Sequence, residues 1–306
     1  MSVSPLATLL DAVARPGAYE ALRILDDERR LSSIIPELEA GRGFVQPERH
    51  YYDVLNHNLG AVQALEAGLG EGEHAEELRT MLGWVDFRES LDREIEGIPL
   101  LSLIRISVLV HDLAKPETAI IRDGALKFPR HGPRGAEILR ERLPEIGFGP
   151  AATDFMARMV RYHLRPGELV KAWPPTDHAV RKFVADLDGH VLPLLLVNLS
   201  DGWSTMGPRY TRENFRRHIG FFNYVLARAW AVTQPGEPHL VTGEDLITTF
   251  DMESGRLLGV VLTSVHRAQL QGTVRNKEQA MALARETLAS LRAETASAAF
   301  RPAGDR

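Results

Sequence analysis

The pentad Val110-His111-Asp112-Leu113-Ala114, followed by Lys115, places a neutral nitrogen ligand beside an anionic oxygen ligand. It closes the apolar run 100–110, so both polar side chains stand at the end of a segment that the sequence predicts to be buried. An unpaired buried charge is strongly unfavourable, so Asp112 requires a partner. These residue types favour one or two divalent metal ions as that partner, with a phosphate ester as substrate.

Other histidines and one aspartate could complete such a metal centre. The candidate ligands are His57, His111, Asp112, His131, His163 and Asp201. They lie far apart in the sequence, so several helices must bring them together. Imidazole nitrogen suits transition metals, and a carboxylate such as that of Asp112 can bridge a pair of ions. We expect one or two divalent ions from the group Mn, Ni, Co, Fe, Zn and Mg.

Cationic side chains accompany these candidates. Lys115 follows His111 by one helical turn, and Arg130 and Arg134 flank Pro133, which opens a predicted helix. The N-terminus of a helix flanked by arginines is a ready anion site. We expect Asp112, Lys115 and Arg134 to act in catalysis. We expect Lys115, Arg130 and Arg134 to hold the substrate phosphate.

Each candidate also has a purely structural interpretation. His57 lies opposite an apolar helical stripe, as a surface histidine would, and His131 could be an ordinary loop histidine. His163 follows an apolar stripe, which is typical of a hydrogen-bonded core histidine. A neighbouring arginine could satisfy Asp201. Taken together, the complete set indicates a metal centre more strongly than any member does alone.

Apolar residues recur with helical period along most of the chain, and strand signals are scarce. The predicted helices span 4–14, 17–28, 31–36, 50–68, 74–82, 100–115, 133–143, 150–164, 176–186, 189–202, 211–232, 243–249, 254–270 and 275–292. Segment 120–128, with Asp123-Gly124 at its centre, predicts a short β-hairpin. The fold class is therefore all-α, a helical bundle with a smaller helical C-terminal tail.

Segment 233–239 holds two prolines and a glycine, which indicates a linker. It suggests a division into an N-terminal helical segment (1–48), a histidine-rich body (49–232) and a helical tail (240–295).

Composition excludes several kinds of chemistry. The chain has 306 residues, no cysteine and a net charge of −5. Disulfides, zinc–thiolate sites, iron–sulfur clusters and thiol nucleophiles are therefore excluded. The acidic charge argues against a broad polyanion-binding surface but leaves room for a local basic patch. Residues 1–10 lack the features of a signal peptide, and no apolar stretch is long enough to span a bilayer. We expect a soluble, cytoplasmic protein without membrane contact.

The order of these candidates, H…HD…H…H…D, resembles the HD superfamily of metal-dependent phosphohydrolases. His57, His111-Asp112 and Asp201 match its general signature, while His131 and His163 resemble the additional ligands of dinuclear members. The segment 128–136 also resembles the stretch after HD in these enzymes. The resemblance implies a helical HD domain, here within 49–232.

Longer blocks resemble the body and tail of bacterial tRNA nucleotidyltransferases, the CCA-adding enzymes and poly(A) polymerase relatives that carry an HD domain. The similar blocks are 21–25, 34–38, 46–57, the HD block, 239–247 and 272–280. That family has a catalytic head with a Gly-Ser motif and a paired Asp-x-Asp. We find neither before His50, and Asp26-Asp27 lacks the spacing. We therefore do not expect nucleotide addition, and only the HD chemistry is carried over.

The resemblance implies hydrolysis of phosphate esters of nucleotides or RNA ends, with 2′,3′-cyclic phosphodiesterase or phosphatase activity favoured. One alternative is a nucleotidase for free mononucleotides. Another is a non-catalytic tRNA- or RNA-binding protein, and we expect no sequence-specific DNA recognition. Basic residues at helical spacing could contact RNA phosphates in that case, or could be solvated helix faces. They are Arg158, Arg161, Arg165, Arg209, Arg212 and Arg216, with Arg267, Arg275 and Lys277 in the tail.

Overall fold

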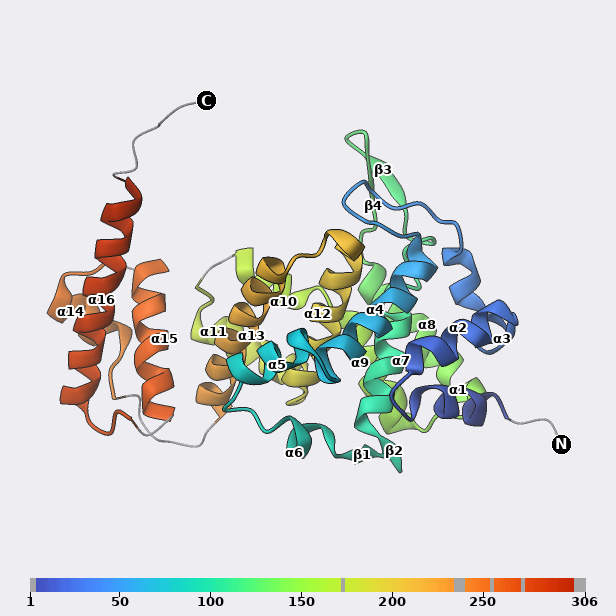
Figure 1. The fold of residues 1–306 in the computed structure, drawn as a ribbon, viewed down its shortest axis with the longest axis horizontal. Helices are drawn as coiled ribbons and strands as arrows, with labels where there is room; N and C mark the ends of the chain where they lie inside the picture. The colour runs from blue at the N-terminus through green and yellow to red at the C-terminus, as the bar shows by residue number, and fades with distance from the viewer. Residues whose placement is uncertain (1–3, 172–173, 234–239, 254–255, 271–272, 300–306) are drawn as a thin grey trace. The chain divides into compact units, whose positions relative to one another are not determined.

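The computed structural model describes residues 4–171, 174–233, 240–253, 256–270 and 273–299. The described chain is predominantly helical and carries two short antiparallel hairpins (Figure 1). The all-α class and the predicted hairpin are confirmed. Residues 234–239 of the predicted linker lie outside the described residues. The chain divides into two compact units, Met1–Pro166 with Asp186–Asn223, and Gly167–Ala185 with Tyr224–Arg306. The three-part division remains a prediction.

The elements follow one another without long gaps in the described chain. The first are α1 (Pro5–Val13), α2 (Ala18–Asp27), α3 (Arg30–Ile34), the 3-10 helix η1 (Pro36–Gly41), α4 (Val54–Leu69), α5 (Glu73–Met81) and α6 (Phe87–Leu91). Next come β1 (Glu94–Ile95), β2 (Ile98–Pro99), α7 (Leu100–Val110), β3 (Ile120–Arg122), β4 (Ala125–Lys127), α8 (His131–Ile146) and α9 (Pro150–Tyr162). The remainder are α10 (Arg165–Lys171), α11 (Asp177–Asp186), α12 (Val191–Met206), η2 (Gly207–Arg209), α13 (Arg212–Thr233), α14 (Gly243–Phe250), α15 (Arg256–Leu270) and α16 (Lys277–Ala299). Every predicted helix overlaps one of these, while α6 and α10 were not predicted.

Both hairpins turn through two residues with positive φ. In β3–β4, Asp123 (φ 55°) and Gly124 (φ 72°) form the turn that the sequence predicted. In β1–β2, Glu96 (φ 54°) and Gly97 (φ 74°) form a turn of the same kind. This second hairpin has only two residues in each strand, too few to show alternation in the sequence.

The start of α4 is fixed by Asp53. One carboxylate oxygen accepts the backbone N–H of Asn56 at 2.7 Å, which caps the helix, and the other accepts the N–H of Gly43 at 3.0 Å. The helix packs against α2, α7 and α12. Because His57 lies in its first turn, this cap also sets the position of a candidate ligand.

Helix α7 is almost wholly buried, and its one charged residue has a hydrogen bond and an ion-pair contact. Arg105, 5% exposed, donates to the carbonyl of Val13 at 2.8 Å and lies 3.5 Å from the Glu66 carboxylate. Glu66 also accepts the N–H groups of Gly17 and Tyr19 at the start of α2, at 2.9 and 3.0 Å. These contacts tie α1, α2, α4 and α7 into one body that supports the candidate ligands.

The predicted helix 100–115 is shorter in the structure. Helix α7 ends at Val110, with His111 as its C-cap, and the chain continues in turns through residue 118. The N–H of Lys115 then bonds the carbonyl of Asp112 at 2.9 Å. The His-Asp pair therefore stands at the carboxyl end of a buried helix rather than on its side.

The junction of α8 and α9 depends on glycine. A Cβ on Gly132 would lie 2.9 Å from the carbonyl oxygen of Arg161 and 3.0 Å from that of Val160. One on Gly135 would lie 2.9 Å from a methyl of Val160. The missing side chains allow the start of α8 to pack against the end of α9, where His131 and His163 stand.

The second unit contains α14, α15 and α16, which share a small apolar core. The side chains that are fully buried there are Val241, Leu246, Val261, Val265, Ala280 and Ala284. Thr242 and Asp245 form a capping box at the start of α14, as the sequence pattern of a hydroxyl followed by an acid suggests.

Taken singly, no helix in the described part of the chain has the length and apolar composition of a membrane span; α11 and α12 pass only when counted together as a bent pair.

Replacing Gly132 with alanine tests whether this junction is tightly packed. The new methyl group would meet backbone oxygens that cannot rotate away, so we expect the free energy of unfolding to fall by about 1–3 kcal/mol in urea titrations. The matched control is Gly220→Ala in α13, where nothing lies within 4 Å of the added Cβ. That variant should be neutral or more stable by up to about 1 kcal/mol. Equal stability of the two variants would contradict the close packing.

Candidate metal centre

Five helices position the six predicted ligands, and all of these except Asp201 lie at or next to a helix end. His57 comes from the first turn of α4, and His111 and Asp112 directly follow α7. His131 begins α8, His163 is the C-cap of α9, and Asp201 lies on α12. The six side chains fall into two neighbouring groups that share Asp112.

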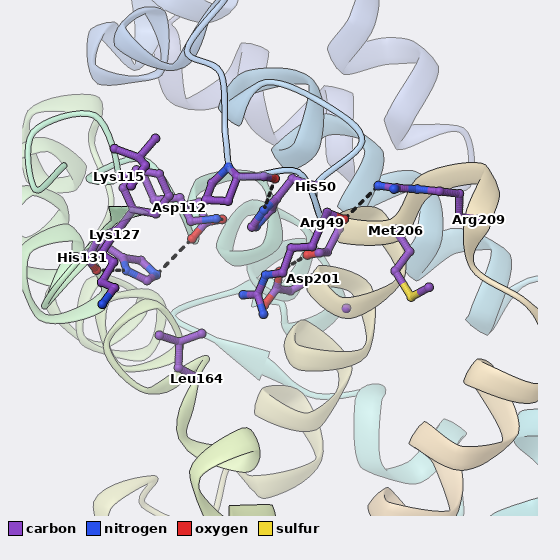
Figure 2. A pocket seen from close by; sticks show the side chains of 15 residues that line it. Arg49, His50, Asp112, Lys115, Lys127, His131, Leu164, Asp201, Met206 and Arg209 are labelled. Carbon is purple, nitrogen blue, oxygen red and sulfur yellow. Dashed lines mark hydrogen bonds and ion pairs between the residues drawn. The ribbon is translucent and has the colours of Figure 1, made fainter. Parts of the chain in front are cut away.

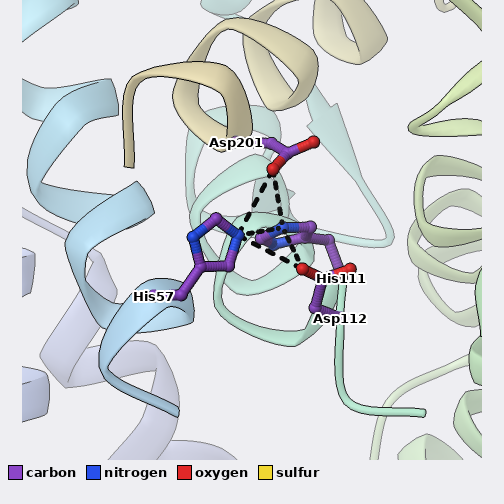
Figure 3. A group of neighbouring side chains, drawn as sticks. All are labelled: His57, His111, Asp112 and Asp201. Atoms are coloured by element: carbon purple, nitrogen blue, oxygen red, sulfur yellow. Dashed lines mark hydrogen bonds and ion pairs between the residues drawn. The ribbon is translucent and has the colours of Figure 1, made fainter. Parts of the chain in front are cut away.

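The first group contains His57, His111, Asp112 and Asp201, whose polar atoms converge (Figure 3). His57 Nε2 lies 3.1 Å from His111 Nε2, 3.2 Å from Asp112 Oδ2 and 3.3 Å from Asp201 Oδ1. His111 Nε2 lies 3.3 Å from the same oxygen of Asp112. His57 is fully buried, so the surface interpretation of this histidine is wrong.

The second group contains His131, His163 and the other oxygen of Asp112. Asp112 Oδ1 lies 3.2 Å from His131 Nε2 and 3.5 Å from His163 Nε2, and these two nitrogens are 3.1 Å apart. Each carboxylate oxygen of Asp112 therefore faces one group. Asp112 is therefore common to two groups of side chains, each of which could hold a metal ion.

Hydrogen bonds fix which nitrogen of three histidines faces the centre. The Nδ1 atoms of His111, His131 and His163 each lie 2.7 Å from the carbonyl oxygen three residues earlier. A carbonyl only accepts, so each Nδ1 carries the hydrogen and donates it. The Nε2 atom of each neutral ring then presents a lone pair to the centre, as a metal ligand requires.

The donor set fits a cation. The Nε2 atoms of His131 and His163 face each other at 3.1 Å, and both oxygens of Asp112 face imidazole nitrogens. Neither oxygen of Asp112 has a hydrogen-bond partner of acceptable geometry in the described part of the chain. Buried lone pairs arranged in this way repel one another unless positive charge lies between them.

The pKa values show how strongly the two carboxylates attract positive charge. Burial lowers the pKa of His111, but Asp112 and Asp201 outweigh burial and raise it to about 10. Burial raises the pKa of Asp112, yet Lys115 and His111 hold it well below the ordinary value. His111 and His57 likewise keep the pKa of Asp201 well below its ordinary value against the effect of burial. Without metal, the site therefore holds a proton in its place.

Lys115 contributes a positive charge next to the Asp112 carboxylate. Its ammonium lies 2.5 Å from Asp112 Oδ2 and donates to Gln46 Oε1 at 2.7 Å. Gln46 in turn donates to the carbonyl of Tyr52 at 3.2 Å. Gln46 was not singled out in the sequence as a site residue; its only signal was its place in the block that resembles tRNA nucleotidyltransferases.

A cavity of about 830 Å³ opens onto this centre (Figure 2). The centre contributes Asp112, Lys115, His131 and Asp201 to its lining. His50, a second residue that the sequence analysis missed, also lines it. Burial, and then the charge of Lys115, lower the pKa of His50 to about 4, so this ring is neutral at pH 7. Because this cavity opens onto the centre, it gives a substrate a path to Asp112 and Asp201.

Two predicted phosphate ligands lie elsewhere. Arg130 and Arg134, both within the described residues, are not among the side chains that line the cavity. The Nε of Arg134 donates to Glu117 at 2.7 Å, and its Nη1 lies 3.3 Å from Glu137. The physical reason is that neighbouring carboxylates already satisfy this guanidinium. Contact of Arg130 or Arg134 with substrate stays a prediction.

A hydrogen-bonded chain couples the two ligand-bearing helices α9 and α12. Asn198, one turn before Asp201 on α12, donates its Nδ2–H to the carbonyl of His163 at 3.0 Å. His218 Nε2 lies 3.0 Å from Asn198 Oδ1, and Tyr210 Oη lies 3.3 Å from His218 Nδ1. Burial lowers the pKa of His218 to about 4, so the neutral ring can donate from Nε2 and accept at Nδ1. This chain satisfies a carbonyl that the end of α9 leaves without a helical donor.

Comparison with known proteins relates the chain to tRNA nucleotidyltransferases. No protein-family model matches the chain. It is 26% identical over 275 residues to the A-adding tRNA nucleotidyltransferase of Deinococcus radiodurans, covering 87% of this chain and 54% of that protein. It is 26% identical over 271 residues to the CC-adding tRNA nucleotidyltransferase of Thermus thermophilus, covering 87% and 52%. The chain thus spans about half the length of the curated relatives it matches. The predicted similarity to tRNA nucleotidyltransferases is confirmed.

Metal binding should release a proton, because an ion that uses His111 Nε2 must displace the proton held there below a pKa of about 10. The apparent association constant for Mn²⁺ should therefore rise about tenfold per pH unit as the pH increases from about 6.5 to 8.5. Calorimetric titration in buffers of different ionisation enthalpy counts the released proton. Asp11→Asn, an exposed carboxylate on α1, is the matched control and should change neither result. An affinity independent of pH would contradict this electrostatic account.

Proposed function

We propose that this chain is a metal-dependent phosphohydrolase that acts on phosphate esters of nucleotides or RNA ends, with 2′,3′-cyclic phosphodiesters as the favoured substrates. One observation carries the proposal: the two oxygens of Asp112 each face a separate group of imidazole nitrogens, at 3.2–3.5 Å. Under this proposal residues 49–232 carry the hydrolytic centre and 240–295 form an appended helical part.

The ligand assignment follows the two groups. His57, His111 and Asp201 would hold one ion, His131 and His163 the other, and Asp112 both. Divalent ions at such a pair of positions supply Lewis-acid activation of water and neutralise charge that develops on a phosphoryl group. The mixed imidazole and carboxylate set suits Mn, Fe, Co, Ni or Zn better than Mg.

The residues around the centre can orient a cyclic phosphate. Lys115, held by Gln46 and Asp112, presents its ammonium at the cavity wall and can bind a non-bridging phosphate oxygen. The neutral ring of His50 can hydrogen-bond a ribose hydroxyl. Hydrolysis forms one bond from a water oxygen to phosphorus and breaks the bond from phosphorus to O2′ or O3′. The freed ribose oxygen takes the proton that the attacking water gives up.

A second candidate function is favoured by the sequence similarity alone. Because 87% of the chain is similar to tRNA nucleotidyltransferases, the protein could bind tRNA or other RNA without hydrolysing it. A nucleotidase for free mononucleotides is a variant of the first proposal, and the size of the preferred substrate separates the two.

Hydrolysis of 2′,3′-cyclic AMP tests the proposal. Metal-stripped protein, supplied in turn with Mn²⁺, Ni²⁺, Co²⁺ and Mg²⁺, should regain turnover with at least one ion. Asp112→Ala removes the shared ligand and should lower that turnover by at least about 10³-fold. Asp11→Ala, which lies on the exposed side of α1, is the matched control and should retain it.

Two outcomes would decide against hydrolysis. Turnover that survives in Asp112→Ala would place the chemistry outside this centre. A metal-loaded protein that binds RNA but hydrolyses neither cyclic phosphates, phosphorylated RNA ends nor mononucleotides would favour the RNA-binding alternative.

A further inference from the structure

The cavity is larger than the metal centre needs. Its volume of about 830 Å³ lies in the upper part of the range of about 300–1,000 Å³ that is usual for ligand sites. Its lining extends from the centre to the loop 47–50 and to the end of α12, with Thr205, Met206 and Arg209. A terminal phosphate at the centre would therefore leave a second part of the cavity for more of the same ligand.

That second part carries positive charge without an acidic partner. Arg49 and Arg209 both line it, and neither forms an ion pair with a carboxylate among the described residues. Figure 2 shows Arg209 on the side of the cavity opposite Lys127 and His131. Lys127, in contrast, lies 3.3 Å from Asp123. The unneutralised charge is thus concentrated on one wall.

Contacts with the backbone hold Arg209 in place. Its Nη2 donates to the carbonyl of Arg49 at 2.9 Å and lies 3.4 Å from that of Glu48. The guanidinium also lies over the ring of Tyr51, 6.0 Å from its centroid. A cation fixed by neutral groups keeps its full charge and has little side-chain entropy left to lose when it binds an anion.

The neighbouring arginines show the opposite behaviour. Arg212 lies 2.8 Å from Glu73 and 3.1 Å from Glu77, and Arg216 also contacts Glu77. Arg158 lies 2.6 Å from Asp154. These members of the predicted basic stripes are therefore satisfied by carboxylates, and Arg209 is the member whose charge faces the cavity.

We propose that Arg49 and Arg209 form a second anion subsite, which binds the internucleotide phosphate next to the terminal nucleotide of an oligoribonucleotide. The inference rests on the proposed function, because the terminal phosphate must lie at the His/Asp centre. Tyr51, 54% exposed beside Arg209, offers a ring against which the base of the second nucleotide can stack. The preferred substrate is then an RNA end rather than a mononucleotide.

Three substrates distinguish the contribution of this subsite to kcat/KM from that of the His/Asp centre. They are 2′,3′-cyclic AMP, the dinucleotide ApA with a 2′,3′-cyclic phosphate end, and the same dinucleotide with an uncharged methylphosphonate linkage. The wild-type holoenzyme should prefer the charged dinucleotide over 2′,3′-cyclic AMP by at least tenfold in kcat/KM. The methylphosphonate should lose most of that preference because it lacks the charge that the arginines bind.

Substitution of the two arginines tests the assignment. In Arg49→Ala/Arg209→Ala, kcat/KM for the charged dinucleotide should fall at least tenfold more than for 2′,3′-cyclic AMP, mainly through KM. Arg49→Ala alone should show part of the effect; among the described residues its side chain forms no hydrogen bond or ion pair that the substitution would break. Arg212→Ala is the matched control, because that arginine pairs with Glu73 and Glu77, and it should preserve the preference. Equal loss on both substrates, or no loss, would overturn the subsite.

A binding measurement tests the anion subsite independently of the proposed hydrolysis. Fluorescence anisotropy of 5′-labelled ApA with a cyclic end should show weaker binding in the double variant. The slope of log K against log salt should also shrink by about 0.7, as expected for one lost phosphate contact to a single strand. If wild type hydrolyses none of the substrates, the proposed function fails, and this binding result alone decides for or against the subsite.

Discussion

The buried carboxylate of Asp112 is the charge on which the rest of this structure depends. It lies directly after a buried helix, is 1% exposed, and has four imidazole nitrogens and one ammonium around it. A single buried anion could be satisfied by one arginine. Here its two oxygens face two separate groups of imidazole nitrogens, and this division supports the proposed metal centre.

The surrounding fold holds these donors by their backbones. Asp53 caps α4 before His57, glycines let α8 approach α9 at His131 and His163, and Asn198 satisfies the carbonyl of His163 from the helix that bears Asp201. The cap, the glycine packing and the Asn198 hydrogen bond each act at a helix end, where few residues determine the direction of a side chain. Small changes in packing there would move one side chain of the His/Asp centre relative to the others, so the stability of the fold and the geometry of the centre are coupled.

Sequence reasoning reached the fold class and the identity of the clustered residues because both depend on local patterns. Helical period and the Asp-Gly turn are local, and the order of histidines and aspartates could be compared with a known signature. What it missed depends on distant contacts. The burial of His57 comes from α7 and α12 packing on α4, and the pairing of Arg134 with Glu117 spans 17 residues. Gln46 and His50 enter the site through a loop whose path no local pattern specifies.

The relatives of this chain are named as A-adding and CC-adding tRNA nucleotidyltransferases, which transfer nucleotides, whereas the reaction proposed for its His/Asp centre is hydrolysis. The proposed hydrolysis depends only on residues gathered around Asp112, and the cavity next to them carries the arginines expected of a site for RNA ends.

The most direct test of the shared carboxylate is electron paramagnetic resonance of the protein loaded with Mn²⁺, combined with metal analysis. The account predicts two Mn²⁺ ions per chain and an exchange-coupled spectrum, as expected for ions about 3.5–4 Å apart. Asp112→Ala should lose that coupling. One ion per chain, or a spectrum of isolated Mn²⁺ at any loading, would contradict the claim that Asp112 joins two metal positions.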